Sequence, residues 1–517
     1  MKVANFMLYL ACMVSLSATA QEATFSKRFS FGFPASIFSS VVVVDTNYYI
    51  TGVIADSIPP NKKGNIFVQF NRSGEAQSVK TLRSATKTYE IWRGNMLQCL
   101  DENFLACGLT FEQGNAKSLL IKYSPQGDTL FTREYPNFFN DTLYTRAEDI
   151  ALSNEGGFIM ATQNRKEAAV NHNEFGVLKL DSLGNVQWHR VYGSPNYSDN
   201  ARSVLAVGDR YLVGGNYNDG HISREDITFR TQVISLDADG ELEWRYLSPT
   251  GELQIGANDM VATPDGGILV VSGSGVEVPA GPGFGQLRWH NYAYKLDSSR
   301  QVEWGVVVRD SLPAIMGNNH LSAGILVNNG YAMAGNLIAR TPENWFFSGV
   351  LAKVSFNGEL LWKRYYQHIP EEGPRHYIYD LAQASDGSFI LVGEVWEPGT
   401  TPSQQGWLLK VDEYGCLVPG CEVVQSAEDS KSPADLPQLL LYPNPVSEEL
   451  QVYFSAPAGD EYHFRILDTQ GREWRRFSTR LSEVTLLVEV GELPGGVYYL
   501  QCLREGKVVG VEGFVKR

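Results

Sequence analysis

The feature that most constrains the fold of this chain is a degenerate repeat with a period near 57 residues. Its nine-residue core joins an apolar segment, a turn and a tryptophan; the clearest copies are LDSLGNVQW (180–188), LDADGELEW (236–244), LDSSRQVEW (296–304) and VSFNGELLW (354–362). With weaker copies at 70–78, 123–131 and 411–419, the turn position falls at Gly74, Gly127, Gly184, Gly240, Arg300, Gly358 and Gly415. Upstream of each copy an apolar segment ends near a small residue, at Gly52, Gly108, Thr162, Gly215, Gly273, Gly335 and Gly393. Two markers that keep step over seven units establish a sevenfold repeat.

Each unit predicts four short strands. In the third unit, residues 148–153 and 157–163 form a hairpin around Gly156, which supplies the positive φ that such turns need. Residues 175–182 and 185–193 form the next hairpin. Apolar residues alternate only partly, as in sheets covered on both faces. Seven four-stranded units predict an all-β fold whose main domain is a seven-bladed β-propeller.

The propeller is predicted to occupy residues 21–425. The recurring tryptophans are predicted to pack between adjacent blades rather than to hold a cofactor, and no cofactor is predicted; they are Trp188, Trp244, Trp304 and Trp362. The seventh unit has no clear fourth strand, whereas residues 24–32 (TFSKRFSFG) resemble the fourth strands of other units. We therefore expect the N-terminal segment to complete the last blade; the alternative is a frayed terminus.

The first 20 residues have the pattern of a signal peptide. Lys2 precedes an apolar stretch, and Ala18-Thr19-Ala20 forms a small-x-small cleavage site. The alternative is a lipoprotein signal at Cys12, although Tyr9-Leu10-Ala11 is a poor match to a lipobox. No later segment is long and apolar enough to predict a membrane span.

Export permits disulfides. Cys416 and Cys421 flank a Pro-Gly turn in the sequence GCLVPGC and are predicted to form one. Whether Cys99 and Cys107 pair depends on strand register and is left open. The cysteines and histidines show no metal-ligand spacing, so no metal site is predicted. A net charge of −15 argues against a nucleic-acid partner.

The repeat stops after residue 425. Residues 426–437 are polar and charged, as in a linker. Residues 438–517 contain six or seven short strands, which is the number and spacing expected of an Ig-like β-sandwich. Four motifs stand out in this segment: Tyr442-Pro443-Asn444-Pro445, the turn Asp468-x-x-Gly471, the run Leu493-Pro494-Gly495-Gly496-Val497-Tyr498, and the terminal basic residue Lys516.

These motifs resemble the C-terminal sorting domain of type IX secretion cargo, type A. The resemblance implies that the secretion machinery is a partner, and that the chain passes through the periplasm to be released or held at the outer-membrane surface. The alternative is an ordinary Ig-like binding domain.

No catalytic constellation is apparent in the sequence, and no catalytic residue is predicted. In a four-stranded blade the connections between second and third strands share one face of the disc, and the longest here are 164–174, 217–231, 276–291, 338–348 and 395–406. They place aromatic and polar side chains on or near that face: Phe284, Arg288, Trp289, His290, Trp345, Trp396 and Trp407. Such side chains suit a glycan or protein ligand, with Arg288, Trp289, His290, Trp345 and Trp396 as the candidate binding residues. The alternatives are a polymer-degrading hydrolase or lyase that uses carboxylates on this face, and a spacer without a ligand.

Overall fold

The computed structural model describes residues 24–517, except 57–61, 92–95, 140–142, 166–172, 195–196, 223–226, 250–253, 279–285, 309–318, 341–344, 370–372, 418–437, 456–460, 469–471, 481–482 and 505–506. The predicted signal peptide (1–20) and linker (426–437) lie outside the described residues, as does Cys421.

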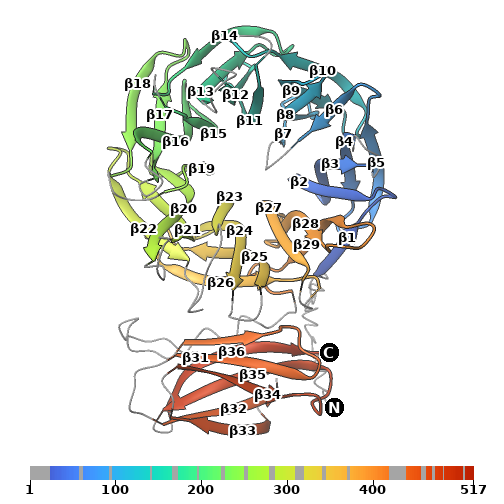
Figure 1. Ribbon diagram of the computed structural model, residues 1–517, viewed down its shortest axis with the longest axis vertical. Coiled ribbons are helices and arrows are strands. Elements are labelled where there is room, and N and C mark those ends of the chain that lie inside the picture. The colour runs from blue at the N-terminus through green and yellow to red at the C-terminus, as the bar shows by residue number, and fades with distance from the viewer. Residues whose placement is uncertain are drawn as a thin grey trace, which may run out of the picture.

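Seven blades of antiparallel strands form a ring, one for each repeat, with the first strand of each blade nearest the centre (Figure 1). A parallel pairing of Ala35 with Gln404 joins blades 7 and 1 into one sheet. Blade 1 consists of β2 (Ala35–Val44), β3 (Asn47–Ala55), β4 (Lys63–Phe70) and β5 (Ala76–Leu82). Blade 2 consists of β6 (Lys87–Glu90) and β7 (Met96–Gln98), which share the inner position, β8 (Phe104–Glu112), β9 (Asn115–Tyr123) and β10 (Thr129–Tyr135). Blade 3 consists of β11 (Thr145–Leu152), β12 (Phe158–Arg165), β13 (Asn173–Leu180) and β14 (Val186–Val191).

Blades 4 to 7 continue the ring. They are β15 (Asn200–Val207), β16 (Arg210–Ile222), β17 (Ile227–Leu236) and β18 (Leu242–Leu247); β19 (Asp259–Ala262), β20 (Ile268–Val278), β21 (Gln286–Leu296) and β22 (Val302–Val308); β23 (His320–Val327), β24 (Gly330–Arg340), β25 (Trp345–Val354) and β26 (Leu360–Tyr366); and β27 (Arg375–Gln383), β28 (Phe389–Trp396), β29 (Gln404–Val411) and β1 (Phe25–Phe29). The prediction of a seven-bladed propeller is confirmed.

The N-terminal strand closes the ring. β1 pairs antiparallel with β29, from Phe25 opposite Lys410 to Phe29 opposite Gly406. The Ser26 hydroxyl accepts a hydrogen bond from Trp407 Nε1 at 2.9 Å and lies 2.8 Å from His368 Nδ1. The predicted completion of the last blade from both ends of the propeller is therefore confirmed.

Each gap between neighbouring blades holds its own apolar core. Successive residues on a strand point to opposite gaps: Leu105 belongs to the core between blades 2 and 3, whereas Ala106 belongs to the core between blades 1 and 2. The same division holds around the ring. A strand that faces a core on both sides needs apolar residues at consecutive positions, which explains the partial alternation of the sequence.

The tryptophan of the repeat contacts the hairpin turn of the next blade. Trp188 Nε1 donates to the Ala238 carbonyl at 3.0 Å, and Trp304 Nε1 donates to the Phe356 carbonyl at 2.9 Å. These acceptors lie in the turns of Gly240 and Gly358, and an added Cβ on Gly358 would collide with the Trp304 indole. The prediction that these tryptophans pack between blades is confirmed.

One blade replaces the turn glycine with arginine. Arg300 keeps the positive φ of the other turns, at 67°. Its guanidinium carbon lies 4.9 Å from the ring of Trp244, the tryptophan of the preceding blade. A cation–π contact thus takes the place of the close indole–glycine contact.

The second sequence marker is explained by a bulge in the innermost strand. In blade 1 the register shifts between Phe38 and Ser40, and the carbonyl of Ile37 lies over the Cα of Gly52. An added Cβ on Gly52 would overlap that carbonyl. Gly393 in blade 7 meets the carbonyl of Tyr377 in the same way, which explains why a small residue recurs there.

Three aspartates on innermost strands join alternate pairs of blades. In each, Oδ1 accepts the N–H of the following residue at 2.8 Å, and Oδ2 accepts an N–H from the next blade. The partners are Val204 for Asp149 (2.8 Å), Gly324 for Asp259 (2.8 Å) and Val41 for Asp380 (2.9 Å). Desolvation by the surrounding blades raises the pKa of Asp259 to about 7 and that of Asp380 to about 6.

The C-terminal segment folds as a small β-sandwich with a core of its own. Its sheets consist of β30 (Gln438–Tyr442), β31 (Glu449–Ser455) and β34 (Glu483–Glu489), and of β33 (Glu473–Thr479), β32 (Tyr462–Asp468), β35 (Gly496–Arg504) and β36 (Lys507–Lys516). All buried residues of its core lie between Leu439 and Phe514, so this segment does not share the cores of the propeller.

The cysteines divide into free and bonded groups. Cys99, Cys107 and Cys502 are free thiols, which answers the question left open for the first two. Cys416 is disulfide-bonded. Because Cys421 lies outside the described residues, its pairing with Cys416 stays a prediction.

We predict that Gly358→Ala destabilises the propeller more than Gly266→Ala does. Both glycines have a φ of 81°, so an alanine is strained in either turn, at a cost of about 1–2 kcal/mol. Only Gly358 faces an indole, whereas the nearest atom to an added Cβ on Gly266 is 3.9 Å away. Thermal unfolding should show a further loss of about 1–3 kcal/mol for Gly358→Ala. Equal losses would contradict the role of the indole–turn contact.

We also predict a pH-dependent effect of Asp259→Asn. Between about pH 4 and pH 7, folded Asp259 retains a proton that the unfolded chain has lost, so its contribution to stability decreases as the pH rises. One pKa unit corresponds to about 1.4 kcal/mol. The unfolding free energy of the wild type minus that of the variant should therefore be more positive at pH 5 than at pH 8. A difference that grows with pH would refute the raised pKa.

Candidate binding face and sorting element

The strand order divides the propeller into two faces. The connections between second and third strands, and those between blades, lie on one side, which we call the loop face; it includes Trp345 and Trp396. The tight turns of the hairpins, such as those of Gly240 and Gly358, lie on the other side, the turn face.

Several segments predicted as long loops are instead strand extensions: β16 and β17 run through most of 217–231, and β20, β21, β24 and β25 through much of 276–291 and 338–348. This prediction was wrong because the hairpins continue beyond the blade.

An aromatic and cationic cluster lies on the loop face where blades 6 and 7 meet. Trp345 opens β25, is 43% exposed and stacks on Phe347 with centroids 6.2 Å apart. The guanidinium carbon of Arg375, the first residue of β27, lies 4.9 Å from the Phe347 ring centroid and 4.4 Å from that of Trp396. Arg375 and Trp396 are opposite each other in the sheet register. These four residues form the Arg375 cluster.

A second layer supports the cluster. Tyr377 meets Phe347 edge-on at 6.2 Å and stacks with Tyr379 at 6.3 Å. The Tyr379 hydroxyl donates to Glu394 Oε1 at 2.6 Å, and Gln404 Nε2 donates to Glu394 Oε2 at 2.8 Å. Burial raises the pKa of Glu394. Both oxygens of this carboxyl group have a donor, so Glu394 holds Tyr379, which in turn stacks on Tyr377.

The other predicted binding residues have different surroundings. Trp289 and His290 are partly buried on β21 of blade 5, and the Arg288 side chain lies outside the described part of the chain, as does Phe284. Trp407 was wrongly placed at the surface: it is 1% exposed and packs edge-on against His376 at 5.6 Å. The structure thus brings together Trp345 and Trp396 through two residues that sequence reasoning missed, Phe347 and Arg375. Arg375 escaped notice because it begins an inner strand rather than a loop.

Two neighbouring carboxylates near the loop face, Glu174 and Asp199, are deeply buried. Glu174 and Asp199 both lie next to Gly193 and are 3% and 0% exposed. Asp199 accepts the N–H of Asn218 at 2.6 Å, and burial raises its pKa to about 6. A polymer could not reach either group in this conformation, so they fit a structural role better than a pair of catalytic acids.

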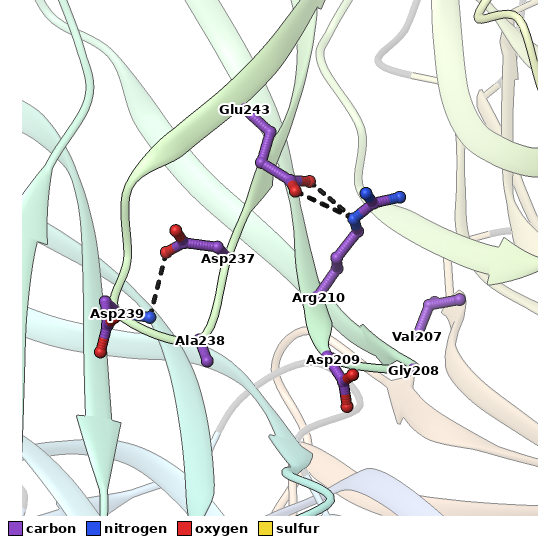
Figure 2. Close-up of a pocket in the computed structure, with 8 residues that line it drawn as sticks. All are labelled: Val207, Gly208, Asp209, Arg210, Asp237, Ala238, Asp239 and Glu243. Carbon is purple, nitrogen blue, oxygen red and sulfur yellow. Dashed lines mark hydrogen bonds and ion pairs between the residues drawn. The ribbon is translucent and has the colours of Figure 1, made fainter.

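The turn face of blade 4 carries an open hollow of about 510 Å³ (Figure 2). Most of its charged side chains are already paired: Arg210 Nε lies 3.0 and 2.8 Å from the two Glu243 oxygens, and Asp237 Oδ1 accepts the Asp239 N–H at 3.0 Å. Within the described ranges no group of three or more His, Cys, Asp or Glu is arranged to hold a metal ion.

The sorting motifs predicted from sequence converge in the sandwich. Asn444, in the loop after Tyr442 and Pro443, donates from Nδ2 to the Gly513 carbonyl at 3.0 Å and accepts the Val515 N–H at 2.8 Å. Val446, next to Pro445, forms a parallel bridge with Lys516.

The third motif meets the same strand. Gly496 lies opposite Lys516 in the register of β35 and β36. Tyr498 stacks on Phe514 at 5.6 Å, and its hydroxyl donates to the Pro494 carbonyl at 2.9 Å. The first, third and last motifs thus form one element at the edge of the sandwich, which we call the sorting element.

A secreted propeller with a terminal sorting domain is the class of protein that this architecture defines. Residues 440–516 match the family described as the secretion system C-terminal sorting domain. The chain is therefore cargo of the type IX secretion system, exported through the periplasm to the cell surface or the medium. The secretion machinery is its partner in this step.

No curated protein matches the sequence. Among solved structures, Drosophila Semaphorin 2a aligns with 9% identity and a TM-score of 0.43 over 96% of this chain and 97% of its own. A protein of unknown function from Dyadobacter fermentans DSM 18053 aligns with 10% identity and a TM-score of 0.40, over 64% of this chain and 99% of its own. At these scores the likenesses carry no argument, and the fold rests on the sheets themselves.

In the described part of the chain there is no helix long and apolar enough to cross a membrane.

We predict that Asn444→Ala impairs export. The substitution removes both hydrogen bonds that tie the loop to β36, at a cost of about 1 kcal/mol for each. Immunoblots of cell fractions should show more of the cargo in the periplasm and less outside. His463→Ala, at an exposed position on β32, is the matched control. Export of both variants at the wild-type level would show that this loop is dispensable.

Proposed function

We propose that the exported propeller is a non-catalytic binding module that holds a glycan or a protein on its loop face. The Arg375 cluster supports this proposal most directly. It combines an exposed indole, further aromatic surface and a cation at the meeting point of two blades. Aromatic rings offer large contact areas at low entropic cost, and tryptophan, tyrosine and arginine dominate binding energy at interfaces.

The rigidity of the cluster supports the same role. Its side chains come from β25, β27 and β28, which are strands rather than free loops. Tyr377, Tyr379 and Glu394 fix them from below. A surface that is ordered before it meets a ligand loses less conformational entropy on binding.

The proposal also covers the signal peptide, the domain boundaries and the disulfide of the chain. We infer that residues 1–20 direct the chain to the periplasm as a cleaved signal peptide. The propeller then spans 21–425, the linker 426–437 and the sorting domain 438–517. The bonded state of Cys416 supports the Cys416–Cys421 disulfide, which would close the loop after the last propeller strand.

The proposal predicts that Trp345→Ala abolishes ligand retention on a glycan and peptide array probed with the full exported chain. Trp345 and Tyr414 are each 43% exposed, but Tyr414 lies in the turn that follows β29, on the turn face, so Tyr414→Ala is the matched control. Equal binding by both variants would exclude the Arg375 cluster. Breakdown of an arrayed polymer would instead favour a hydrolase or lyase, and a blank array would favour a spacer.

A further inference from the structure

The guanidinium of Arg375 has an unusual environment for a cation in a folded protein. Its neighbours are the aromatic rings of Phe347 and Trp396 and the side chain of Tyr377, with which it forms a hydrogen bond. Among the described residues, no carboxylate forms an ion pair with it. Other arginines of the chain do pair, as Arg210 does with Glu243.

The acidic groups nearest to Arg375 are already engaged. Glu394 lies below the cluster, but its two oxygens accept hydrogen bonds from Tyr379 and Gln404. Glu397, one residue after Trp396, forms an ion pair with Arg28 of the closing strand. The sheet therefore places carboxylates around the cluster and still leaves the guanidinium without one.

Apart from a hydrogen bond to the Tyr377 side chain, the N–H donors of Arg375 are the unused part of the cluster. Aromatic rings attract the charge of a guanidinium but accept few of its hydrogen bonds. Its five donors form a planar fork that matches the two oxygens of a carboxylate. Trp345 meanwhile presents an exposed indole 6.2 Å, centroid to centroid, from the Phe347 ring that Arg375 contacts.

Together these groups fit a ligand with a carboxylate next to a flat, weakly polar ring face. We propose that the Arg375 cluster binds a uronate residue of an acidic polysaccharide: the carboxylate pairs with Arg375, and the sugar ring lies on Trp345. This inference rests on the proposed binding function and narrows the ligand to one chemical class. An acidic peptide shares the charge but lacks a sugar ring to cover the indole.

Polygalacturonate and its fully methyl-esterified form are the appropriate probes, because they share a backbone and differ in the free carboxylate. Calorimetric titration of the full chain should show at least about 10-fold tighter binding of the acid form, since hydrogen bonds between charged groups contribute more than neutral ones. Arg375→Gln should remove this preference while leaving the weak binding of the ester unchanged. Trp345→Ala should weaken binding of both polymers.

Arg133→Gln is the matched control, because Arg133 also lies 4.9 Å from an aromatic ring, that of Phe131, on the outer strand of blade 2. It should bind both polymers as the wild type does. Thermal unfolding of Arg375→Gln at the wild-type temperature would show that a loss of binding does not come from misfolding.

The outcomes separate this inference from the proposal it rests on. Equal affinity for acid and ester, lost in Trp345→Ala, would overturn the uronate assignment and keep the loop face as a binding site. Tighter binding of poly-glutamate than of polygalacturonate would overturn it in favour of an acidic peptide. No binding of polygalacturonate would overturn it outright, and binding unaffected by Trp345→Ala would overturn the proposed site as well.

Discussion

The contact on which the rest of the structure depends is that between an aromatic or long side chain on the outer strand of one blade and the hairpin turn of the next. Trp188 and Trp304 make it with an indole N–H bonded to a turn carbonyl. The outer strand of blade 7 is β1, the N-terminal strand, and it makes the equivalent contact with blade 1. An added Cβ on Gly74 would lie 2.5 Å from the Phe25 ring, and Lys27 Nζ donates to the Ser73 carbonyl at 2.7 Å. In each of these contacts the outer strand of one blade meets the turn of the next blade in the same direction around the ring. Because β1 makes this contact with blade 1, the ring has no free end.

This closure also determines where a binding site can form. The closing strand supplies Arg28, which engages Glu397, and Ser26, which engages Trp407 beneath the loop face. Blade 7 is therefore fixed from both ends of the propeller before it presents Arg375 and Trp396 to blade 6. A site between two blades can be rigid only if their separation is fixed, and the apolar core between blades 6 and 7 provides this.

Much of the fold could be predicted from the sequence, because the residues that repeat are the ones that hold blades together. The turn glycine and the tryptophan are two sides of one contact, and Gly52 and Gly393 lie under a bulge. Both constraints act on the backbone and so recur in most blades, although Arg300 replaces the turn glycine in blade 5. The sorting element was predictable for a similar reason, since Asn444 and Gly496 serve the local backbone geometry of β36.

The candidate site could be predicted only in part. Trp345 and Trp396 were identified as aromatic residues near the loop face, but proximity to a loop does not fix the direction of a side chain. Trp407, eleven residues after Trp396, is buried because β29 lies between β28 and β1 and turns that indole inward. Arg375 gave no signal, since its role depends on rings from two other strands. The contacts that define a ligand site are not repeated, so no periodicity reveals them.

Closure of the ring gives Phe25–Phe29 a hydrogen-bonded partner in β29, and hydrogen–deuterium exchange of the β1 amides measures whether that pairing persists in solution. If the ring is closed, these amides exchange as slowly as those of β14 or β18, the outer strands of blades built from one continuous segment. Exchange of the β1 amides at the rate of an unstructured peptide, with the other outer strands protected, would contradict closure of the ring.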